Sequence, residues 1–171
     1  FARRSAEARR ERASLRRRWA LPEDAIVFLF CGKFEPKKRP FDLLQALRLA
    51  SDSLPAHVLM VGDGALRVEC ETMVRRHALP VRFAGFLNQS EMPAAYAVSD
   101  CLVLPSDNGE TWGLVVNEAM ACGLPAVVSD QVGCHPDLIH DGLTGYTYPC
   151  GDVAALSQRL HSLAHARPHL A

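Results

Sequence analysis

SDNGETWGLVVNEAMACGLPAVVSD, residues 106–130, is the stretch from which the fold can be inferred. It opens with a turn cluster, Asp-Asn-Gly at residues 107–109. Apolar residues then recur at helical spacing from Gly113 to Ala121, and Gly-Leu-Pro at residues 123–125 ends that pattern. The apolar run at residues 126–128 follows at once and predicts a buried strand. A helix that leads directly into a buried strand is typical of α/β proteins.

The same alternation extends over the rest of the chain. Short apolar runs predict strands at residues 25–31, 57–61, 81–83, 101–104 and 146–147. Helical patterns cover residues 41–50, 66–77, 90–98 and 152–165, with Ser90 as the expected N-cap of the third. We therefore expect an α/β fold, a Rossmann-like parallel sheet with helices on both faces. Such sheets bind ligands at the carboxyl ends of their strands, here the loops at residues 32–38, 62–64, 85–87 and 106–113.

Length and composition describe one globular domain. The chain has 171 residues, of which 49% are hydrophobic and 22% charged. No run approaches the roughly 18–20 apolar residues of a membrane span, and no signal-peptide pattern opens the chain. The six cysteines form no CxxC pair, and Cys31, Cys101 and Cys122 lie in or beside apolar runs, which predicts buried free thiols. Free thiols are typical of a reducing compartment, so we expect a cytoplasmic protein.

Charge is distributed unevenly along the chain. Residues 1–18 contain eight arginines and two glutamates, a net charge of +6, so the remainder carries −6. A basic helical segment can contact a membrane surface or a nucleic acid. The alternative, which we favour, is a solvated helix that packs on its own or a neighbouring domain. Because no aromatic platform is interleaved with the arginines, nucleic acid is not an expected partner, whereas a peripheral membrane contact stays open.

Two carboxylates bracket the predicted turn and helix, Glu110 just before it and Glu118 inside it. A helix N-terminus has unpaired N–H groups and a partial positive charge, so the backbone of Thr111, Trp112 and Gly113 can bind an anion. Carboxylates accept hydrogen bonds from sugar hydroxyls. A ligand with hydroxyls at both ends and phosphate between them, such as a nucleotide-sugar, fits this order. On spacing alone, two solvated helix-end acids are the simpler explanation.

The sequence ETWGLVVNE at residues 110–118, followed by AMACGLPAVVS, closely resembles the E-x7-E signature of retaining glycosyltransferases of the GT-B fold, glycosyltransferase family 4 (group 1). The acids, the aromatic-Gly pair, the small-residue helix and the Gly-Leu-Pro turn occur in the same order. The resemblance implies that Glu110 contacts the donor sugar and that Glu118 contacts the ribose hydroxyls of a nucleotide-diphosphate sugar. The other donor-binding residues of this stretch are then Thr111, Trp112, Gly113, Leu114 and Val115.

A basic loop follows the first predicted strand. Its ammonium groups, Lys33 and Lys38, could hold a diphosphate without a metal, although a solvated basic loop explains the charge more simply. In the family this loop usually reads Gly-Arg-x5-Lys-Gly, so the resemblance assigns Lys38 as the phosphate-binding lysine and Lys33 as its partner. Both are assigned catalytic roles together with Glu110. Lys33 stands in place of the usual Arg, which removes a bidentate fork, and Arg39 stands in place of the usual Gly.

Other loops complete the predicted donor site. The resemblance adds Gly32, Gly62, which is expected to keep the pocket floor low, and Phe86 with Leu87, where the family's backbone faces the base. Gly-Cys-His-Pro-Asp at residues 133–137 matches the family's Gly-Gly-x-Pro-Glu turn imperfectly, with Cys134 and Asp137 as departures. No dinucleotide fingerprint is present. The histidines spaced by four near the C-terminus lack a completing ligand, so we expect neither a metal nor another cofactor. These histidines are His161, His165 and His169.

The resemblance covers about residues 20–165 and one half of a GT-B enzyme. It implies that residues 1–20 follow an interdomain linker, that residues 21–171 form the nucleotide-sugar-binding domain, and that the acceptor-binding N-terminal domain lies outside the chain. The full-length enzyme would transfer a sugar, of hexosyl type, to a glycan or lipid, and the isolated domain is expected to be inactive. Two other interpretations stay open. The chain could be a non-catalytic interaction module, or a GT-B relative with epimerase or phosphorylase chemistry.

Overall fold

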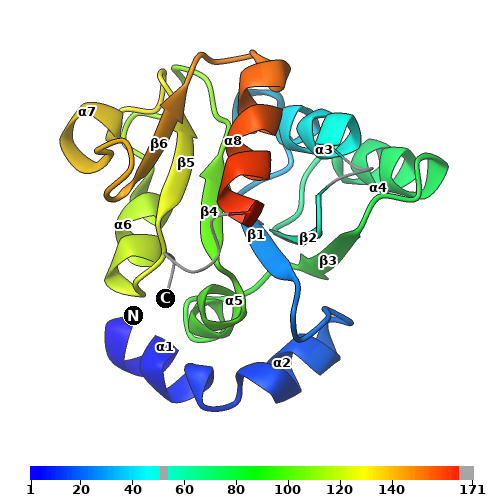
Figure 1. Ribbon diagram of the computed structural model, residues 1–171, viewed down its shortest axis with the longest axis vertical. Helices are drawn as coiled ribbons and strands as arrows, with labels where there is room; N and C mark the ends of the chain where they lie inside the picture. The colour runs from blue at the N-terminus through cyan, green and yellow to red at the C-terminus, as the bar shows by residue number, and fades with distance from the viewer. Residues whose placement is uncertain (51–53, 166–171) are drawn as a thin grey trace.

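The computed structural model describes residues 1–50 and 54–165, which contain a six-stranded parallel sheet (Figure 1). Across the sheet the strands follow the order β3-β2-β1-β4-β5-β6. The expected Rossmann-like α/β sheet is therefore confirmed. The strands are β1 (Ile26–Cys31), β2 (Ala56–Val61), β3 (Val81–Gly85), β4 (Cys101–Leu104), β5 (Ala126–Ser129) and β6 (Gly145–Tyr148).

Helices cover both faces of the sheet, as expected. One face is covered by α3 (Pro40–Ala50), α4 (Arg67–Arg76) and α8 (Val153–His165). The other is covered by α5 (Met92–Val98), α6 (Leu114–Ala121) and α7 (His135–Leu138). Outside α5 lie α1 (Ala2–Arg9) and α2 (Arg12–Arg18), which form the lower edge of the molecule in Figure 1. A short 3-10 turn, η1 (Pro36–Lys38), stands between β1 and α3.

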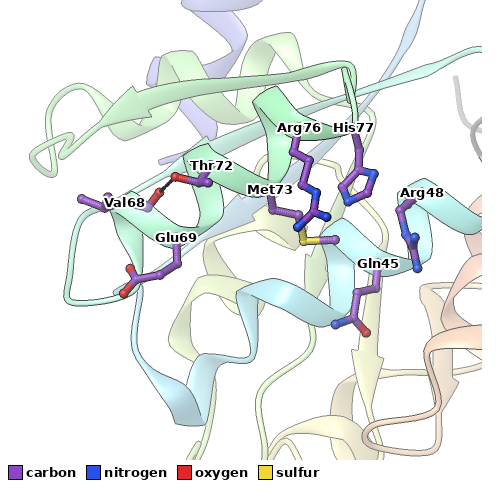
Figure 2. A pocket seen from close by; sticks show the side chains of 8 residues that line it. All are labelled: Gln45, Arg48, Val68, Glu69, Thr72, Met73, Arg76 and His77. Carbon is purple, nitrogen blue, oxygen red and sulfur yellow. Dashed lines mark hydrogen bonds between the residues drawn. The ribbon is translucent and has the colours of Figure 1, made fainter.

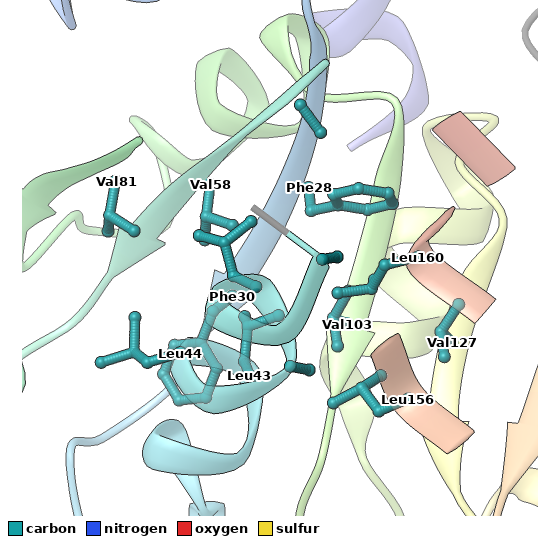
Figure 3. Close-up of a cluster of buried hydrophobic side chains, with 14 of the residues drawn as sticks. Phe28, Phe30, Leu43, Leu44, Val58, Val81, Val103, Val127, Leu156 and Leu160 are labelled. Carbon is teal, nitrogen blue, oxygen red and sulfur yellow. The ribbon is translucent and has the colours of Figure 1, made fainter. Parts of the chain in front are cut away.

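Strand β1 is buried on both faces because its side chains alternate between two cores. Phe28 and Phe30 point into the core beneath α3 and α8, where Figure 3 shows them among leucines of both helices. Val27 and Leu29 point into the opposite core, beneath α5 and α6. This alternation explains why the strand reads as a continuous apolar run in the sequence.

The arginine-rich N-terminal segment differs in detail from the expected pattern. It forms two helices that are separated at Arg10 and Glu11, and both contact α5. Arg16 is 1% exposed and forms an ion pair of 2.9 Å with Asp100. The segment thus packs on its own domain, which confirms the interpretation favoured from the sequence. Within residues 1–50 and 54–165, no helix combines the length and the apolar character that a membrane span requires.

The start of α5 corrects the prediction that Ser90 is its N-cap. The helix begins at Met92 and its N-cap is Glu91, whose side chain makes no capping hydrogen bond; the side-chain acceptor of the preceding turn is Asn88. Its Oδ1 accepts hydrogen bonds from the backbone N–H groups of Ser90 (2.9 Å) and Glu91 (3.2 Å). The prediction was wrong because an asparagine two residues earlier forms the same kind of side-chain turn.

His57, on β2, should make the stability of the fold depend on pH. Burial, followed by the positive charges of Arg82 and Arg16, lowers the pKa of His57 below its ordinary value. The unfolded chain therefore binds a proton at a higher pH than the folded chain does. We expect the free energy of unfolding to fall as the pH is lowered through about 6.5, the ordinary value of a histidine. In His57→Leu, the free energy of unfolding measured in urea should change less between about pH 7.5 and 5 than it does in the wild-type chain. An equal change in both proteins would contradict the lowered pKa of His57.

Candidate functional site

The loops after β1, β2 and β3 contact one another through their backbones. Gly62 N donates to Gly85 O (2.8 Å), and Gly32 N donates to Val61 O (3.0 Å). A Cβ atom on Gly62 would lie 2.0 Å from Gly32 O. The absence of a side chain at Gly62 therefore permits the first two loops to pack together, and its expected role at a pocket floor stays a prediction.

Lys38 and Glu110 form an ion pair between the first loop and the loop after β4. Lys38 Nζ donates to Glu110 Oε2, and each side chain is 15% exposed. Ser106 Oγ lies 3.4 Å from the same carboxylate oxygen. The two loops are also joined where Asp107 N donates to Lys37 O (2.9 Å). Glu110 is therefore not a solvated helix-end acid, and the structure brings together two of the three residues to which catalytic roles were assigned.

A run of unpaired backbone N–H groups follows Glu110. Within residues 1–50 and 54–165, no atom accepts a hydrogen bond from the N–H groups of residues 111–115. Helix α6 begins at Leu114, one residue later than expected, with Gly113 before it in the left-handed region (φ 94°). Thr111 and Trp112 consequently precede the helix. Five consecutive N–H donors beside the ion pair form the kind of backbone surface that binds anions.

The turn at residues 133–134 fixes the segment at residues 110–112 through hydrogen bonds to its backbone carbonyl oxygens. Gly133 N donates to Glu110 O (3.0 Å), and Cys134 N donates to Trp112 O (2.9 Å). A Cβ atom on Gly133 would lie 1.8 Å from Thr111 O, so only glycine fits here without a shift of the backbone. The departure at Cys134 is accommodated by burial, because its side chain is fully buried in the core beneath α5 and α6.

Glu118 is held by a buried tyrosine. Tyr96 OH donates to Glu118 Oε2 (2.7 Å), and the tyrosine side chain is fully buried. Burial, and then the negative charge of Glu118, raises the pKa of Cys31 to about 12, while the nearby Lys38 acts in the opposite direction. Cys31 therefore lies close enough to Glu118 and to Lys38 to be affected by both charges, although it is half-buried and not fully buried as expected. Its thiol stays protonated at neutral pH.

Four of the predicted site residues form no hydrogen bond or ion pair with Lys38, Glu110 or Glu118. Lys33 is exposed and forms no ion pair with any described residue. Phe86 is 78% exposed on the loop after β3, and Leu87 packs beside the core beneath α5. Trp112 is 38% exposed, and its indole Nε1 donates to Asn117 Oδ1 (2.8 Å). These residues lie on or beside loops that follow strands, and their roles in donor binding stay predictions.

Two other features lie away from this site. A groove of about 510 Å³ runs between α3 and α4 on the opposite face of the sheet (Figure 2). Its lining includes Arg48, Met73 and Arg76 but none of the predicted site residues. His161 and His165 stack on α8 with ring centroids 4.2 Å apart, and His169 lies outside the described residues. Over the described ranges, no three or more His, Cys, Asp or Glu side chains gather as metal ligands would.

Comparison with known families assigns the chain to one of them. The family described as "Glycosyl transferases group 1" matches residues 11–171, which is nearly the whole chain. The chain belongs to this family. The match includes α2, the whole sheet and both acids at Glu110 and Glu118, whereas α1 precedes it.

Characterised relatives within the glycosyl transferase group 1 family are longer than this chain. The chain is 39% identical over 150 residues to sulfoquinovosyl transferase SQD2 of Arabidopsis thaliana, covering 85% of this chain and 28% of that protein. It is 34% identical over 165 residues to a D-inositol 3-phosphate glycosyltransferase of Streptomyces bingchenggensis, covering 90% and 36%. The chain thus spans about a third of the length of these relatives.

Two solved structures that superpose on this chain are more than twice as long as the part that matches it. Anabaena Alr3699/HepE, crystallised with UDP, superposes with a TM-score of 0.81 at 23% identity, over 92% of this chain and 43% of that one. Sucrose-phosphate synthase of Thermosynechococcus elongatus superposes with a TM-score of 0.74 at 29% identity, over 93% and 41%. The similarity to Alr3699/HepE shows that this group 1 chain and Alr3699/HepE share a fold.

Sequence reasoning missed two residues of the site in this group 1 chain, Tyr96 and Ser106. Ser106 opens one of the loops expected to bind a ligand, but a serine there carries no specific signal. Tyr96 lies among the apolar positions of a predicted helix, and its hydroxyl needs a hydrogen-bond partner once the ring is buried. That requirement was the available signal, although it does not identify Glu118 as the partner.

Proposed function

We propose that this chain is the donor-binding domain, C-terminal in the full-length protein, of a retaining glycosyltransferase of family 4. The full-length enzyme would transfer a sugar of hexosyl type from a nucleotide-diphosphate sugar to an acceptor. The observation that carries the proposal is the juxtaposition of the Lys38–Glu110 ion pair with five unpaired N–H groups at residues 111–115. The UDP bound to a structural relative supports it.

The proposed roles follow from the charges of the side chains and backbone N–H groups at this site. Lys38 and the N–H groups of residues 111–115 would stabilise the negative charge that develops on the leaving diphosphate, because they are fixed before the ligand arrives. Lys33, which is exposed at the mouth of the first loop, would add a second cation. Glu110 would accept hydrogen bonds from the donor sugar and Glu118 from the ribose. Gly32, Gly62, Phe86 and Leu87 would line the nucleotide side.

The remaining parts of the proposal concern what lies around the domain. Residues 1–20 would follow the interdomain linker and residues 21–171 would bind the nucleotide-sugar. An N-terminal domain would supply most of the site for the acceptor, a glycan or lipid, so the isolated domain should be inactive. Charge on the diphosphate is countered by Lys38 and the backbone, so the proposal requires no metal or other cofactor. We place the enzyme in the cytoplasm, where nucleotide-sugars would be its donors.

Thermal unfolding with nucleotides tests the proposal. The 171-residue chain is heated with UDP, GDP and ADP in turn, and then with the corresponding nucleotide-sugars. A ligand at about 100 times its dissociation constant should raise the free energy of unfolding by ~2.7 kcal/mol. A rise with one nucleotide identifies the base. No rise with any of them, in this chain and in the full-length protein, would overturn the proposal.

Replacing Lys38 or Glu118 by alanine should remove about half of this stabilisation or more. Lys38→Ala removes the cation and leaves the Glu110 carboxylate, which is 15% exposed, to repel a diphosphate. Glu118→Ala removes the acceptor for the ribose. We expect affinity for the nucleotide to fall at least tenfold in each, since a hydrogen bond to a charged group is worth about 1.5–3 kcal/mol. Isothermal titration measures the affinity directly.

Lys37→Ala is the matched control for Lys38→Ala. Lys37 is the neighbouring lysine, its side chain is 49% exposed, and it pairs with Glu35 at 3.7 Å. Its loss removes the same charge from the same loop, so a general electrostatic effect would appear in both variants. Equal losses of affinity in the Lys37 and Lys38 variants would contradict the specific role of Lys38.

A further inference from the structure

Glu118 is a long, flexible side chain at the end of which the proposed ribose contact would form. Its helix, α6, supplies only the backbone position, and the carboxylate itself needs a fixed orientation. Tyr96 OH donates to Oε2 over 2.7 Å, while Oε1 accepts no hydrogen bond from any described residue. One carboxylate oxygen is thus occupied by the protein and the other is available to a ligand.

The tyrosine that makes this contact is itself fixed. Its side chain is 0% exposed in the core beneath α5 and α6. The ring of Phe1 packs edge-on against it, with centroids 6.1 Å apart, so the segment before α1 closes over the ring. Burial, and then the neighbouring Cys31 and Glu118, raises the pKa of Tyr96 far above its ordinary value. The hydroxyl is therefore always a donor at neutral pH.

The helix that carries Glu118 is fastened to the same N-terminal segment. Arg9 donates to the carbonyl oxygen of Cys122 (2.8 Å), which is the residue that ends α6. Helices α1 and α5 pack side by side. The segment at residues 1–9 thus contacts Tyr96 through Phe1 and the C-terminal end of the helix that carries Glu118 through Arg9.

We infer that Tyr96 is a positioning residue that orients the Glu118 carboxylate for the 2′- and 3′-hydroxyls of the donor ribose, an inference that rests on the proposed function. The alternative is that the tyrosine hydroxyl merely satisfies its own burial. The two differ in one respect. A positioning role affects only ligands that carry ribose hydroxyls, whereas a structural role affects every nucleotide equally.

Tyr96→Phe separates these two roles because it keeps the ring and removes the hydroxyl. UDP, GDP and ADP and their 2′,3′-dideoxy counterparts are titrated into the 171-residue chain by calorimetry. We expect the wild-type chain to prefer the ribonucleotide, and Tyr96→Phe to weaken that nucleotide about tenfold or more with little change for the dideoxy form. In a Glu118→Ala background, Tyr96→Phe should have no further effect, which a double-mutant cycle measures.

Tyr148→Phe is the matched control. Tyr148 is also buried, at 2% exposed, but it belongs to the other core and its hydroxyl has no hydrogen-bond partner among the described residues. Its loss should leave both affinities unchanged. A ribose preference that persists in Tyr96→Phe would overturn the inference and leave the proposed function intact. Equal wild-type binding of both forms would overturn it together with the ribose role of Glu118. No binding of any nucleotide, in this chain and in the full-length protein, would overturn both proposals.

Discussion

Asp100→Ala is expected to lower the free energy of unfolding by about 3–5 kcal/mol, the range found when one partner of a buried ion pair is removed. Asp100 is the shared carboxylate of two arginines. Its Oδ2 pairs with Arg16 at 2.9 Å and its Oδ1 with Arg12 at 2.6 Å. It also accepts a hydrogen bond from Val27 N (2.8 Å) at the start of β1. The variant removes all three contacts and leaves the guanidinium of Arg16 buried without this carboxylate.

The position of Arg16 explains why the loss should be large. Its guanidinium also donates to backbone carbonyl oxygens of Glu23 (2.6 Å), Ala25 (2.9 Å) and Val98 (2.9 Å). It therefore connects α2, the entry to β1 and the end of α5 at one point. Equilibrium unfolding in urea, followed by circular dichroism, gives the change in free energy from the midpoint and slope.

Two comparisons make this result interpretable. Glu23→Ala breaks an exposed pair with Arg17, whose partners are 60% and 66% exposed, and should cost less than about 1 kcal/mol. The double variant Arg16→Met with Asp100→Leu replaces the buried charges by apolar side chains, but it leaves the carbonyl oxygens of Glu23, Ala25 and Val98 without this donor, so it should be no more stable than Asp100→Ala. A loss in Asp100→Ala no larger than that in Glu23→Ala would contradict the buried-pair account.

Gly133→Ala is expected to disturb the candidate site strongly, because the added methyl group would overlap with backbone atoms. The new Cβ would lie 1.8 Å from Thr111 O, 2.6 Å from Thr111 C and 3.1 Å from Trp112 N. These are backbone atoms, so the segment at residues 110–115 must move. We expect a destabilisation of about 1–3 kcal/mol or more from overpacking, and loss of the stabilisation by nucleotide. Urea unfolding with and without the nucleotide measures both.

Gly32→Ala serves as the matched substitution. Its Cβ would find Lys38 Cδ at 3.5 Å, an ordinary contact with a flexible side chain. The change in the free energy of unfolding should therefore stay within about 1 kcal/mol. If the two alanine variants unfold at the same urea concentration, the close packing of the turn at residues 133–134 on residues 110–112 does not contribute to stability.

Most of the fold could be predicted from local pattern. Strand β1 reads as an apolar run because it is buried on both faces, and its predicted and observed bounds differ by one residue. The predictions were wrong where the start or end of a helix depends on turn geometry or on tertiary packing, neither of which the hydrophobic pattern of the sequence encodes. The choice between Asn88 and Ser90 as acceptor at the start of α5 depends on turn geometry, and the break at Arg10 follows the packing of two short helices on α5.

The candidate site divides in the same way. Residues 110–118 are contiguous, so the sequence could predict the order of acid, backbone donors and second acid. The partners of those acids are distant in sequence: Lys38 for Glu110 and Tyr96 for Glu118. The sequence did not specify which loops lie against each other, because that depends on strand order and register across the sheet. Lys33 was expected to act with Lys38 on the diphosphate; it forms no ion pair with any described residue, and its role stays a prediction.

Strand order also has a consequence for biosynthesis. β1 pairs on one side with β2 but on the other with β4, where Phe28 lies opposite Cys101. While the ribosome makes the chain, β1, β2 and β3 all emerge before β4 does. One edge of β1, whose residues from Ile26 to Phe30 are at most 2% exposed in the finished fold, then has no neighbour. An unpaired apolar strand edge can pair with other chains and aggregate. Nascent chains that end before residue 101 should therefore depend most on chaperones.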